Sequence, residues 1–454
     1  MTLALRLKIC CIVCALLAVP GLCTAGIVVS DGVCYRILSG SGLTAEVCGF
    51  EGHKAPTAHV RIPEKIIYHS RTYTVTSVAP GAFAEQGAPR LVSVHLPASV
   101  EAIGRAPFRS CRALKRITVD AANPTFMSDG FVLLTRDRSE AVCCAPALPR
   151  GTRIFLPASV VRIRAYAFFE SNLASIYMPG VVHIGPGAFA ESALANVHLS
   201  TTLRTVGESA FRGTHLSKII LPEGVEKVES EAFAACLSLQ QASLPASLRV
   251  LGNEAFAGCT RLRHIVLPEA LTAVGAGTFM GCTALGRIDL PAALGTVGRK
   301  AFAGCTQLSE IRLPAATSQL DEQAFMGCTA LKAVYIGGET ANIGFQAFRD
   351  CITLQRIALS GRSTLGEDAF LGCIRIREIR CRGRQTFRGR ADIWPDEVLR
   401  QATLYVPAGS HTVYTGTDPW RNFWEIREQT PETAGESPFD SGREKATAAA
   451  GQEH

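Results

Sequence analysis

The fold is decided by residues 262–285, whose sequence is LRHIVLPEALTAVGAGTFMGCTAL. The segment Leu262-x-x-Ile265-x-Leu267 ends in an alternation of apolar and other residues, which predicts a short β-strand with one buried face. Pro268 follows, and proline ends a strand because it has no N–H to donate to a ladder. The apolar pair Leu271 and Val274 then predicts a return leg, so the stretch describes one coil.

The same pattern runs through most of the chain. Phenylalanines equivalent to Phe279 recur at steps of 25, 60, 21, 22, 22, 23, 23, 23, 23, 23 and 22 residues. Apart from the single long step, this period lies within the range of leucine-rich repeats. These phenylalanines are Phe83, Phe108, Phe168, Phe189, Phe211, Phe233, Phe256, Phe279, Phe302, Phe325, Phe348 and Phe370.

A single coil cannot fold alone. It buries about six apolar side chains, worth roughly 1.5–3 kcal/mol each, whereas ordering its backbone costs about 1–2 kcal/mol for each of some 23 residues. Stacked coils share one continuous core, so the repeat predicts a solenoid.

Glycine recurs after the valine of the return leg. We expect this glycine to occupy a turn with positive φ, which glycine adopts without steric cost. Arg164, Glu229 and Asp321 stand at the same place in other coils, so the turn prefers glycine without requiring it. The glycines are Gly104, Gly185, Gly207, Gly252, Gly275, Gly298, Gly344 and Gly366.

The repeat Leu-Pro-x-x-Leu-x-x-Val-Gly-x-x-Ala-Phe-x-Gly-Cys-Thr-x-Leu resembles that of BspA-like proteins, the treponemal-type class of leucine-rich repeats, over residues 31–427. The resemblance implies a repeat solenoid, a right-handed leucine-rich-repeat coil with a parallel β-sheet on one face. We expect about 12 repeats of 21–25 residues, capped at both ends. Caps are also expected on physical grounds, because an end coil exposes apolar side chains and strand edges.

The resemblance also suggests how the chain is divided. The solenoid spans residues 75–382, with a hairpin insertion at about residues 120–152 that accounts for the step of 60. An N-terminal β cap covers residues 26–74, and a C-terminal cap covers residues 383–427. Residues 428–454 are rich in Glu, Thr, Ala and Gly with few large apolar side chains, which predicts a disordered tail.

Residues 1–25 have the features of a secretory signal peptide. Positive charge at Arg6 and Lys8 leads into an apolar core, and Cys23-Thr24-Ala25 offers a small-residue cleavage site. The apolar run is too short to span a bilayer comfortably, and no later stretch could form an integral membrane segment. We therefore expect export to the periplasm, the outer surface or the medium. Cleavage after Ala25 and lipid attachment at Cys23 both remain open.

Eight of the 13 cysteines beyond residue 25 occupy one repeat position. Other repeats carry Ser171, Ser192 and Thr214 there, which share small size and hydrogen-bonding capacity with cysteine rather than metal chemistry. We expect buried structural thiols that face backbone carbonyls. Cys34 and Cys48 flank a turn in the N-terminal cap and are candidates for a disulfide. The eight repeat cysteines are Cys111, Cys236, Cys259, Cys282, Cys305, Cys328, Cys351 and Cys373.

Common catalytic motifs are absent from the sequence. It contains no His-Glu-x-x-His, Gly-x-x-x-x-Gly-Lys-Ser/Thr, Gly-x-Ser-x-Gly or Cys-x-x-Cys, and its ten histidines show no metal-ligand spacing. The net charge of +7 is small and dispersed, which argues against nucleic-acid binding. We expect no enzymatic activity, cofactor or bound metal.

The residues on either side of each strand's central aliphatic point outward, so stacking aligns them in two exposed columns. Residue types vary freely along these two columns but hardly vary along the core columns. Variability of this kind fits a partner-binding surface, and it fits a solvated face without a partner equally well. Phe155, Tyr177 and His198 fall on successive coils and predict an exposed aromatic cluster, and arginines add basic character further along. Aromatic and Arg side chains are enriched in binding hot spots. The candidate partner-binding residues are Phe155, Tyr177, His198, Lys218, His264, Arg287, Arg312, Tyr335 and Arg356.

BspA-like proteins are associated with binding host extracellular matrix proteins and with attachment to cells. The resemblance therefore implies a non-catalytic adhesin that is surface-exposed or released and contacts a host protein. The alternative is a periplasmic structural or assembly protein without a host ligand. The sequence separates the two only weakly, because both need a signal peptide and neither needs an anchor.

Overall fold

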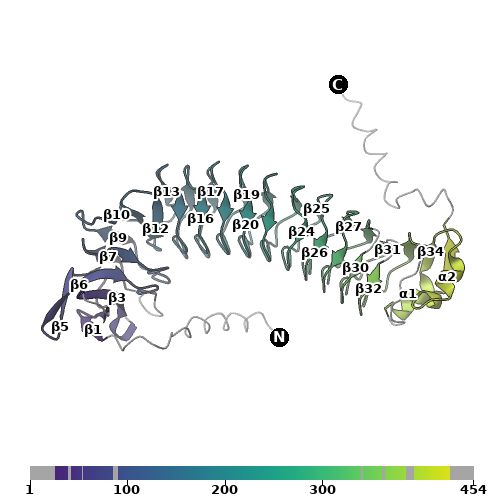
Figure 1. The fold of residues 1–454 in the computed structure, drawn as a ribbon, viewed down its shortest axis with the longest axis horizontal. Helices are drawn as coiled ribbons and strands as arrows, with labels where there is room; N and C mark the ends of the chain where they lie inside the picture. The colour runs from purple at the N-terminus through teal and green to yellow at the C-terminus, as the bar shows by residue number, and fades with distance from the viewer. Residues whose placement is uncertain are drawn as a thin grey trace, which may run out of the picture. The chain divides into compact units, whose positions relative to one another are not determined.

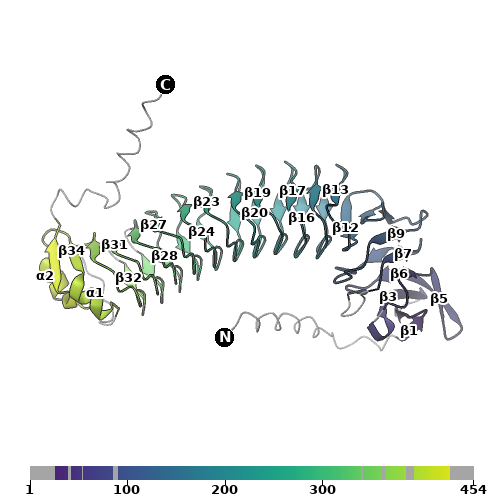
Figure 2. The same cartoon turned by 180° about the vertical axis from the view of Figure 1, so that it is seen from behind.

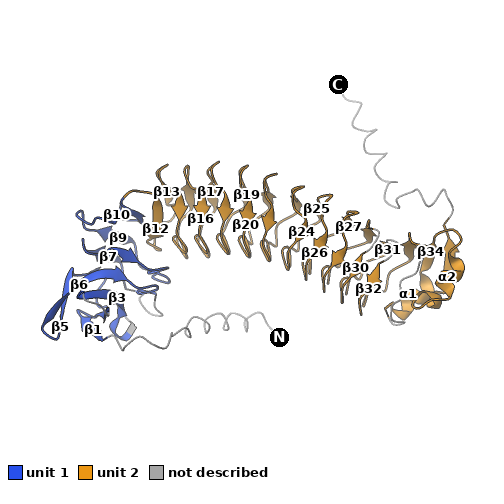
Figure 3. Cartoon of the chain, viewed as in Figure 1, with its two compact units in different colours: residues 1–136 blue, residues 137–454 orange. Residues whose placement is uncertain are grey.

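A computed structural model describes residues 26–38, 42–53, 55–84, 90–338, 341–359, 363–384 and 393–429. The expected signal peptide and all but two residues of the expected tail lie outside these ranges. The chain divides into two compact units, residues 1–136 and residues 137–454 (Figure 3). The division falls within residues 120–152, where the sequence suggested a hairpin inserted into one continuous array.

Unit 1 begins with a mixed β-sheet. The strands β1 (Ile27–Ser30), β2 (Val33–Ile37) and β3 (Thr44–Phe50) pair antiparallel in that order. β3 then pairs in parallel with β6 (Arg71–Val78), whose other partners are β5 (Lys65–Tyr68), which is antiparallel, and β8 (Ala102–Ile103), which is parallel. The buried face carries Val33, Tyr35, Val47 and Val75, so this sheet has its own apolar core.

The rest of unit 1 holds a parallel sheet of β4 (His59–Arg61), β7 (Ser93–Leu96) and β9 (Arg116–Val119). A hairpin of β10 (Phe126–Ser128) and β11 (Val132–Thr135) follows. Asn123 is fully buried before this hairpin. Its amide nitrogen donates to two carbonyls of the previous coil, and its oxygen accepts from the Thr125 and Phe126 amides. This residue therefore ties the hairpin to the coil below it.

Unit 2 is a stack of coils, and each coil contributes two short strands (Figure 1, Figure 2). We call the strand of the Leu-x-x-Ile-x-Leu segment the front strand. The front strands are β13 (Arg153–Phe155), β15 (Ser175–Tyr177), β17 (Asn196–His198), β19 (Lys218–Ile220), β21 (Gln241–Ser243), β23 (His264–Val266), β25 (Arg287–Asp289), β27 (Glu310–Leu313), β29 (Ala333–Ile336), β31 (Arg356–Leu359) and β33 (Glu378–Cys381). They pair in parallel within three sheets, β13–β15–β17, β19–β21–β23–β25 and β27–β29–β31–β33, which we call together the front sheet. The predicted repeat solenoid is confirmed.

The structure adds parallel strands where the sequence shows only an apolar pair on the return leg. We call them the return strands, and most of them are two residues long. They are β12 (Glu140–Cys144), β14 (Arg162–Ile163), β16 (His183–Ile184), β18 (Thr205–Val206), β20 (Lys227–Val228), β22 (Val250–Leu251), β24 (Ala273–Val274), β26 (Thr296–Val297), β28 (Gln319–Leu320), β30 (Asn342–Ile343) and β32 (Thr364–Leu365). They pair in two sheets, one from β12 to β22 and one from β24 to β32, which we call together the return-strand sheet.

The repeat phenylalanines form a continuous buried stack in the core of unit 2. Successive rings from Phe168 to Phe370 have centroids 5.0–5.8 Å apart and are nearly parallel. The Trp394 ring continues the stack, with its centroid 4.7 Å from that of Phe370. Each coil therefore packs on the next through a pair of stacked rings, and this packing sets the spacing between coils.

The glycines after the valine of the return leg do not have positive φ, so this prediction was wrong. Close approach of the preceding coil favours glycine there instead. A Cβ on Gly104 would lie 2.3 Å from the Pro80 backbone nitrogen, and one on Gly252 would lie 2.4 Å from the Ser230 nitrogen. Positive φ occurs instead at the glycine two residues after the core phenylalanine, for example Gly258 and Gly304.

The chain ends in unit 2 with α1 (Asp396–Gln401), β34 (Thr403–Val406), α2 (His411–Thr415), the 3₁₀ turn η4 (Trp420–Asn422) and β35 (Glu425–Glu428). β34 and β35 extend the front sheet beyond β33 in parallel. Trp420 and Phe423 pack beside Trp394 and cover the end of the aromatic stack. β35 includes Glu428, which the sequence assigned to the tail. In the described ranges, no helix has the length and apolar character needed to cross a membrane.

Candidate functional site

Five exposed apolar or aromatic side chains lie in one line across the front strands β13–β23. The parallel register places Phe155 beside Tyr177 and Tyr177 beside His198. Ile220 and Val266 occupy the same position in later coils, and only Ser243 interrupts the line. Phe155 is 73% exposed, Ile220 56% and Val266 52%. We call these five residues the apolar stripe.

The aromatic members of the apolar stripe contact one another. The ring centroids of Phe155 and Tyr177 are 6.2 Å apart, with their planes inclined by 49°. Those of Tyr177 and His198 are 6.0 Å apart, inclined by 57°. Offset or tilted contacts at this distance are favourable, so the rings hold one another in place on the surface. The structure thus brings together three of the residues that the sequence singled out.

Polar side chains form the neighbouring column on the same strands. Lys218 and His264, both predicted binding residues, are exposed there, as is Arg153. Ile220 and Val266 were not among the predicted binding residues, because only aromatic and basic residue types in the outward columns were considered. Following the column position instead of the residue type would have found them.

The front strands beyond β23 have a different surface, which corrects the expected basic character. The Arg287 guanidinium lies 3.0 Å from the Asp289 carboxylate, and the Arg312 guanidinium lies 2.7 Å from that of Glu310. Arg380 pairs with Glu378 in the same way. Each pair joins two residues of one strand, so opposite charges cancel locally. We call the outward residues of β25–β33 the charge-paired segment.

Other parts of the charge-paired segment are less exposed to a binding partner. The Tyr335 ring is half-buried, and the Arg382 guanidinium lies over it at 4.7 Å from the ring centroid. Ala333 and Ala358, in the outward columns beside it, are both 2% exposed. Arg356 remains exposed on β31. The predicted binding residues therefore fall into two groups with different surroundings.

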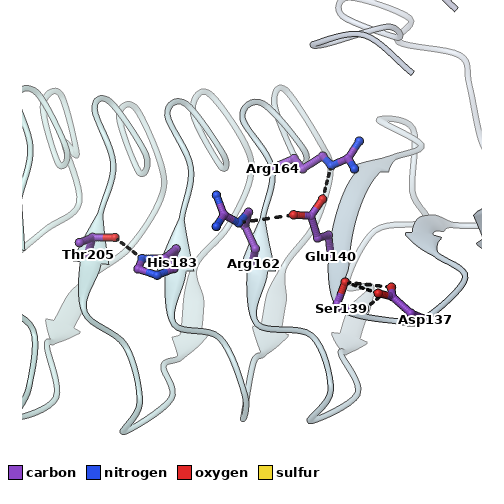
Figure 4. Close-up of polar contacts among 7 residues, drawn as sticks. All are labelled: Asp137, Ser139, Glu140, Arg162, Arg164, His183 and Thr205. Atoms are coloured by element: carbon purple, nitrogen blue, oxygen red, sulfur yellow. Dashed lines mark hydrogen bonds and ion pairs between the residues drawn. The ribbon is translucent and has the colours of Figure 1, made fainter. Parts of the chain in front are cut away.

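A second polar cluster lies on the return strands (Figure 4). The Glu140 carboxylate accepts from Arg164 Nε at 2.6 Å and lies 3.4 Å from Arg162 Nε. His183 Nδ1 lies 2.9 Å from the Thr205 hydroxyl, whereas the Ser139 hydroxyl contacts the Asp137 carboxylate. No histidine is therefore placed to activate Ser139 among the residues drawn. The contacts of Glu140 and His183 tie adjacent coils together, whereas that of Ser139 is local.

The repeat cysteines are buried and engage backbone carbonyls. Cys259 Sγ donates to the carbonyl oxygen of Phe233 at 3.1 Å, and Cys282 Sγ donates to that of Phe256 at 3.1 Å. Each accepting phenylalanine belongs to the preceding coil. The hydroxyl of Ser192 instead donates to Phe189 of its own coil at 2.6 Å. The longer Cβ–Sγ bond thus gives an inter-coil contact that serine does not make.

Burial makes two of these thiols, those of Cys282 and Cys305, hard to ionise. It raises the pKa of Cys282 to about 12, although the backbone at Cys259 lowers it slightly. Burial is also the largest cause that raises the pKa of Cys305 well above its ordinary value. A high thiol pKa and full burial oppose both metal binding and nucleophilic chemistry. Over the described part of the chain, no group of three or more His, Cys, Asp or Glu could hold a metal ion.

Cys34 and Cys48 lie on the paired strands β2 and β3. Cys48 Sγ donates to the carbonyl oxygen of Cys34 at 3.4 Å, and burial is the main cause that raises the Cys48 pKa. The disulfide between them stays a prediction.

The chain was also compared with known proteins. A family model described as BspA type leucine rich repeat region matches residues 65–132, 161–286 and 272–388, in six copies. These ranges cover more than half of the chain. No curated protein matches the sequence.

Several solved structures share the fold. The pneumococcal vaccine antigen PcpA is 19% identical with a TM-score of 0.51, and the match covers 89% of this chain and 99% of that protein. A leucine-rich repeat protein from Bacteroides ovatus is 24% identical with a TM-score of 0.43, covering 78% of this chain and 94% of the other. At these identities the likeness concerns the fold alone.

Proposed function

Because the chain belongs to the BspA type leucine rich repeat family, we propose that it is a non-catalytic protein that binds another protein through the front sheet of unit 2. The observation that carries this proposal is the apolar stripe. Large apolar side chains scattered singly on a surface need no explanation, but a line of them on successive coils indicates an interaction surface. Aromatic residues such as Phe155 and Tyr177 are frequent binding hot spots because they bury much area with few rotatable bonds.

The architecture gives the apolar stripe no structural role. The core beneath it is complete, since the central residues Ile154, Ile176 and Ile219 are each 8% exposed or less. Replacing the outward side chains would leave the phenylalanine stack and both sheets intact. Partner binding accounts for this exposed apolar surface, whereas the solenoid scaffold does not.

We further propose that the partner is a host extracellular matrix or cell-surface protein and that the chain acts as a surface-exposed or released adhesin. The support is the BspA-type repeat together with the signal-like residues 1–25. The test is a binding screen of the full chain against immobilised fibronectin, laminin and collagen. We expect at least one saturable interaction, and the absence of binding to all three would count against a matrix ligand.

Location is tested separately. Protease added to intact cells should digest the protein, because an adhesin must be reachable from outside. Digestion only after the outer membrane is permeabilised would favour the alternative, a periplasmic structural or assembly protein. A known periplasmic protein, followed in the same samples, controls for leakage.

A further inference from the structure

The geometry of the apolar stripe points to one class of occupant. We propose that it binds an amphipathic α-helix of a partner protein, with acidic residues along the flank that faces Arg153 and Lys218. This inference rests on the proposed function and narrows it from protein binding in general to one type of binding segment.

The spacing of the apolar stripe favours a helix. Its members repeat once per coil along a line perpendicular to the strands, whose backbones are about 4.8 Å apart. The exposed rings of Phe155, Tyr177 and His198 are spaced a little more widely, at 6.2 and 6.0 Å between centroids. An α-helix lying along this line presents apolar side chains about once per turn, every 5.4 Å, when they follow i, i+3, i+4, i+7 spacing. From Phe155 to Val266, five coil steps, the mismatch accumulates to about 3 Å, which side-chain rotamers can absorb.

An extended strand fits less well. Lying across the front strands, it would leave its backbone N–H and C=O groups without partners against an apolar surface, whereas an α-helix pairs these groups internally. A polyproline helix repeats a face every three residues, about 9.3 Å, and so contacts only alternate members. Of the three regular backbone conformations, only the α-helix both contacts consecutive members and keeps its backbone polar groups paired.

A carbohydrate is also a poorer match. Sugar rings stack on flat aromatic faces, but the Phe155 and Tyr177 planes are inclined by 49° and do not form a flat platform. Beyond His198 the line continues with Ile220 and Val266, which have no π-face to offer. Apolar side chains of a protein suit both parts of the apolar stripe.

The charged side chains beside the apolar stripe favour one orientation of a bound helix. Arg153 and Lys218 lie in the outward column beside the apolar stripe, and within the described residues neither forms an ion pair. The outward residues of β13–β23 include no acidic side chain, and the first one along the front sheet is Asp289. On the opposite side of the apolar stripe, Glu223 and Glu269 accept hydrogen bonds from backbone amides of the next coil. A helix with glutamates towards Arg153 and Lys218 therefore meets complementary charge.

The experiment uses the full chain and three fluorescent 18-residue peptides, followed by anisotropy. The first peptide carries Leu along one helical face and Glu along one flank. The second replaces Glu by Lys, and the third has a central proline that breaks the helix. We expect the first to bind at least about ten-fold more tightly than the other two, because only it offers both the apolar face and the complementary charge.

Variants of the chain locate the binding. The double substitution Phe155→Ser and Tyr177→Ser should weaken the acidic peptide at least about ten-fold. The matched control Val250→Ser, which alters an exposed apolar residue on the return strand β22, should leave binding unchanged. The charge reversal Arg153→Glu and Lys218→Glu should transfer the preference to the lysine peptide.

Several outcomes would overturn the inference. They are equal binding of the proline peptide, an unchanged charge preference in the reversed variant, and no peptide binding at all. Sedimentation that shows dimerisation abolished by Phe155→Ser would assign the apolar stripe to a second copy of the chain. If a matrix protein binds through the apolar stripe while no peptide does, only the helical partner is excluded. If Phe155→Ser and Tyr177→Ser change no protein interaction, the proposed function itself fails.

Discussion

Two stretches of unit 2 are built on the same core and present opposite surfaces. The coils with front strands β13–β23 expose the apolar stripe, while those with β25–β33 expose the charge-paired segment. Both stretches share the phenylalanine stack and the return-strand sheet. The difference shows that the core columns determine the scaffold, whereas the outward columns are free to carry a binding surface in one place and a solvated face in another.

The residue at the cysteine position of the repeat changes within the first stretch. Ser171, Ser192 and Thr214 cap the earlier coils and bond carbonyls of their own coil. From Cys236 onward the caps are thiols that reach the preceding coil. The coils from β19 onward therefore have one more contact between neighbours, under the apolar stripe and under the charge-paired segment alike.

The largest expected effect is on the free energy of unfolding, which should depend on the phenylalanines of the core and not on those of the surface. Phe189→Ala removes a ring from the buried stack and should lower the free energy of unfolding by about 3–5 kcal/mol. Phe155→Ala, the same substitution on the apolar stripe, should change it by less than about 0.5 kcal/mol. Chemical denaturation of both variants makes the comparison. Similar losses would mean that Phe155 is a structural residue.

Removing three carboxylates should make the surface of the charge-paired segment strongly basic. Replacing Asp289, Glu310 and Glu378 by Ala removes the carboxylates that pair with three arginines and moves the net charge from +7 to +10. Heparin should then bind about ten-fold more tightly at low salt, and the gain should fade as salt is added. The control replaces Glu101, Glu226 and Glu397, which are exposed elsewhere. An equal gain there would show that net charge alone is responsible.

Cysteine and serine should not be interchangeable at the cysteine position of the repeat, which Cys282 and Ser192 occupy. Cys282→Ser should lower the free energy of unfolding by about 1 kcal/mol, because the hydroxyl bonds its own coil and the Phe256 carbonyl loses its thiol donor. The reverse change, Ser192→Cys, should be close to neutral or slightly stabilising. Denaturant titrations of both variants test this, and the opposite ranking would remove the role assigned to the thiols.

The smallest effect concerns the ion pairs of the later stretch. Burial raises the pKa of Asp289, but hydrogen bonds from His264 and Arg287 outweigh it and hold the pKa below its ordinary value. The pairing therefore stabilises the fold above pH about 4, and its contribution is lost as the pH falls through the native-state pKa. Since the carboxylate is exposed, Asp289→Asn should cost about 0.5 kcal/mol at pH 7 and less at pH 3. Denaturant titrations at the two pH values test this, and a loss that grows on acidification would contradict it.

Much of the scaffold could be predicted from the sequence, because each coil repeats the same requirement for buried residues. The period, the front strands and the cysteine column are all visible in the residue pattern. The return strands were not predicted, since two residues are too few to show an alternation. The glycine column was misinterpreted because close backbone approach and positive φ both select glycine, and only the packing of coils distinguishes them.

The surface was harder to predict for a physical reason. Sequence columns show which residues point outward but not which of them pair. Arg287 and Arg312 suggested a basic strip, yet each has a carboxylate two residues away on its own strand. Phe155 and Tyr177 could be predicted as a cluster, because their contact follows directly from the register of adjacent coils.

The central claim is that binding belongs to the apolar stripe and not to the charge-paired segment. The most direct measurement is the affinity of the full chain for whichever of fibronectin, laminin or collagen it binds, in two double variants matched in number of changes. Phe155→Ser with Tyr177→Ser should weaken binding at least about 30-fold, and Arg287→Ser with Arg312→Ser less than about three-fold. Equal losses, or a larger loss from the arginine variant, would contradict the claim.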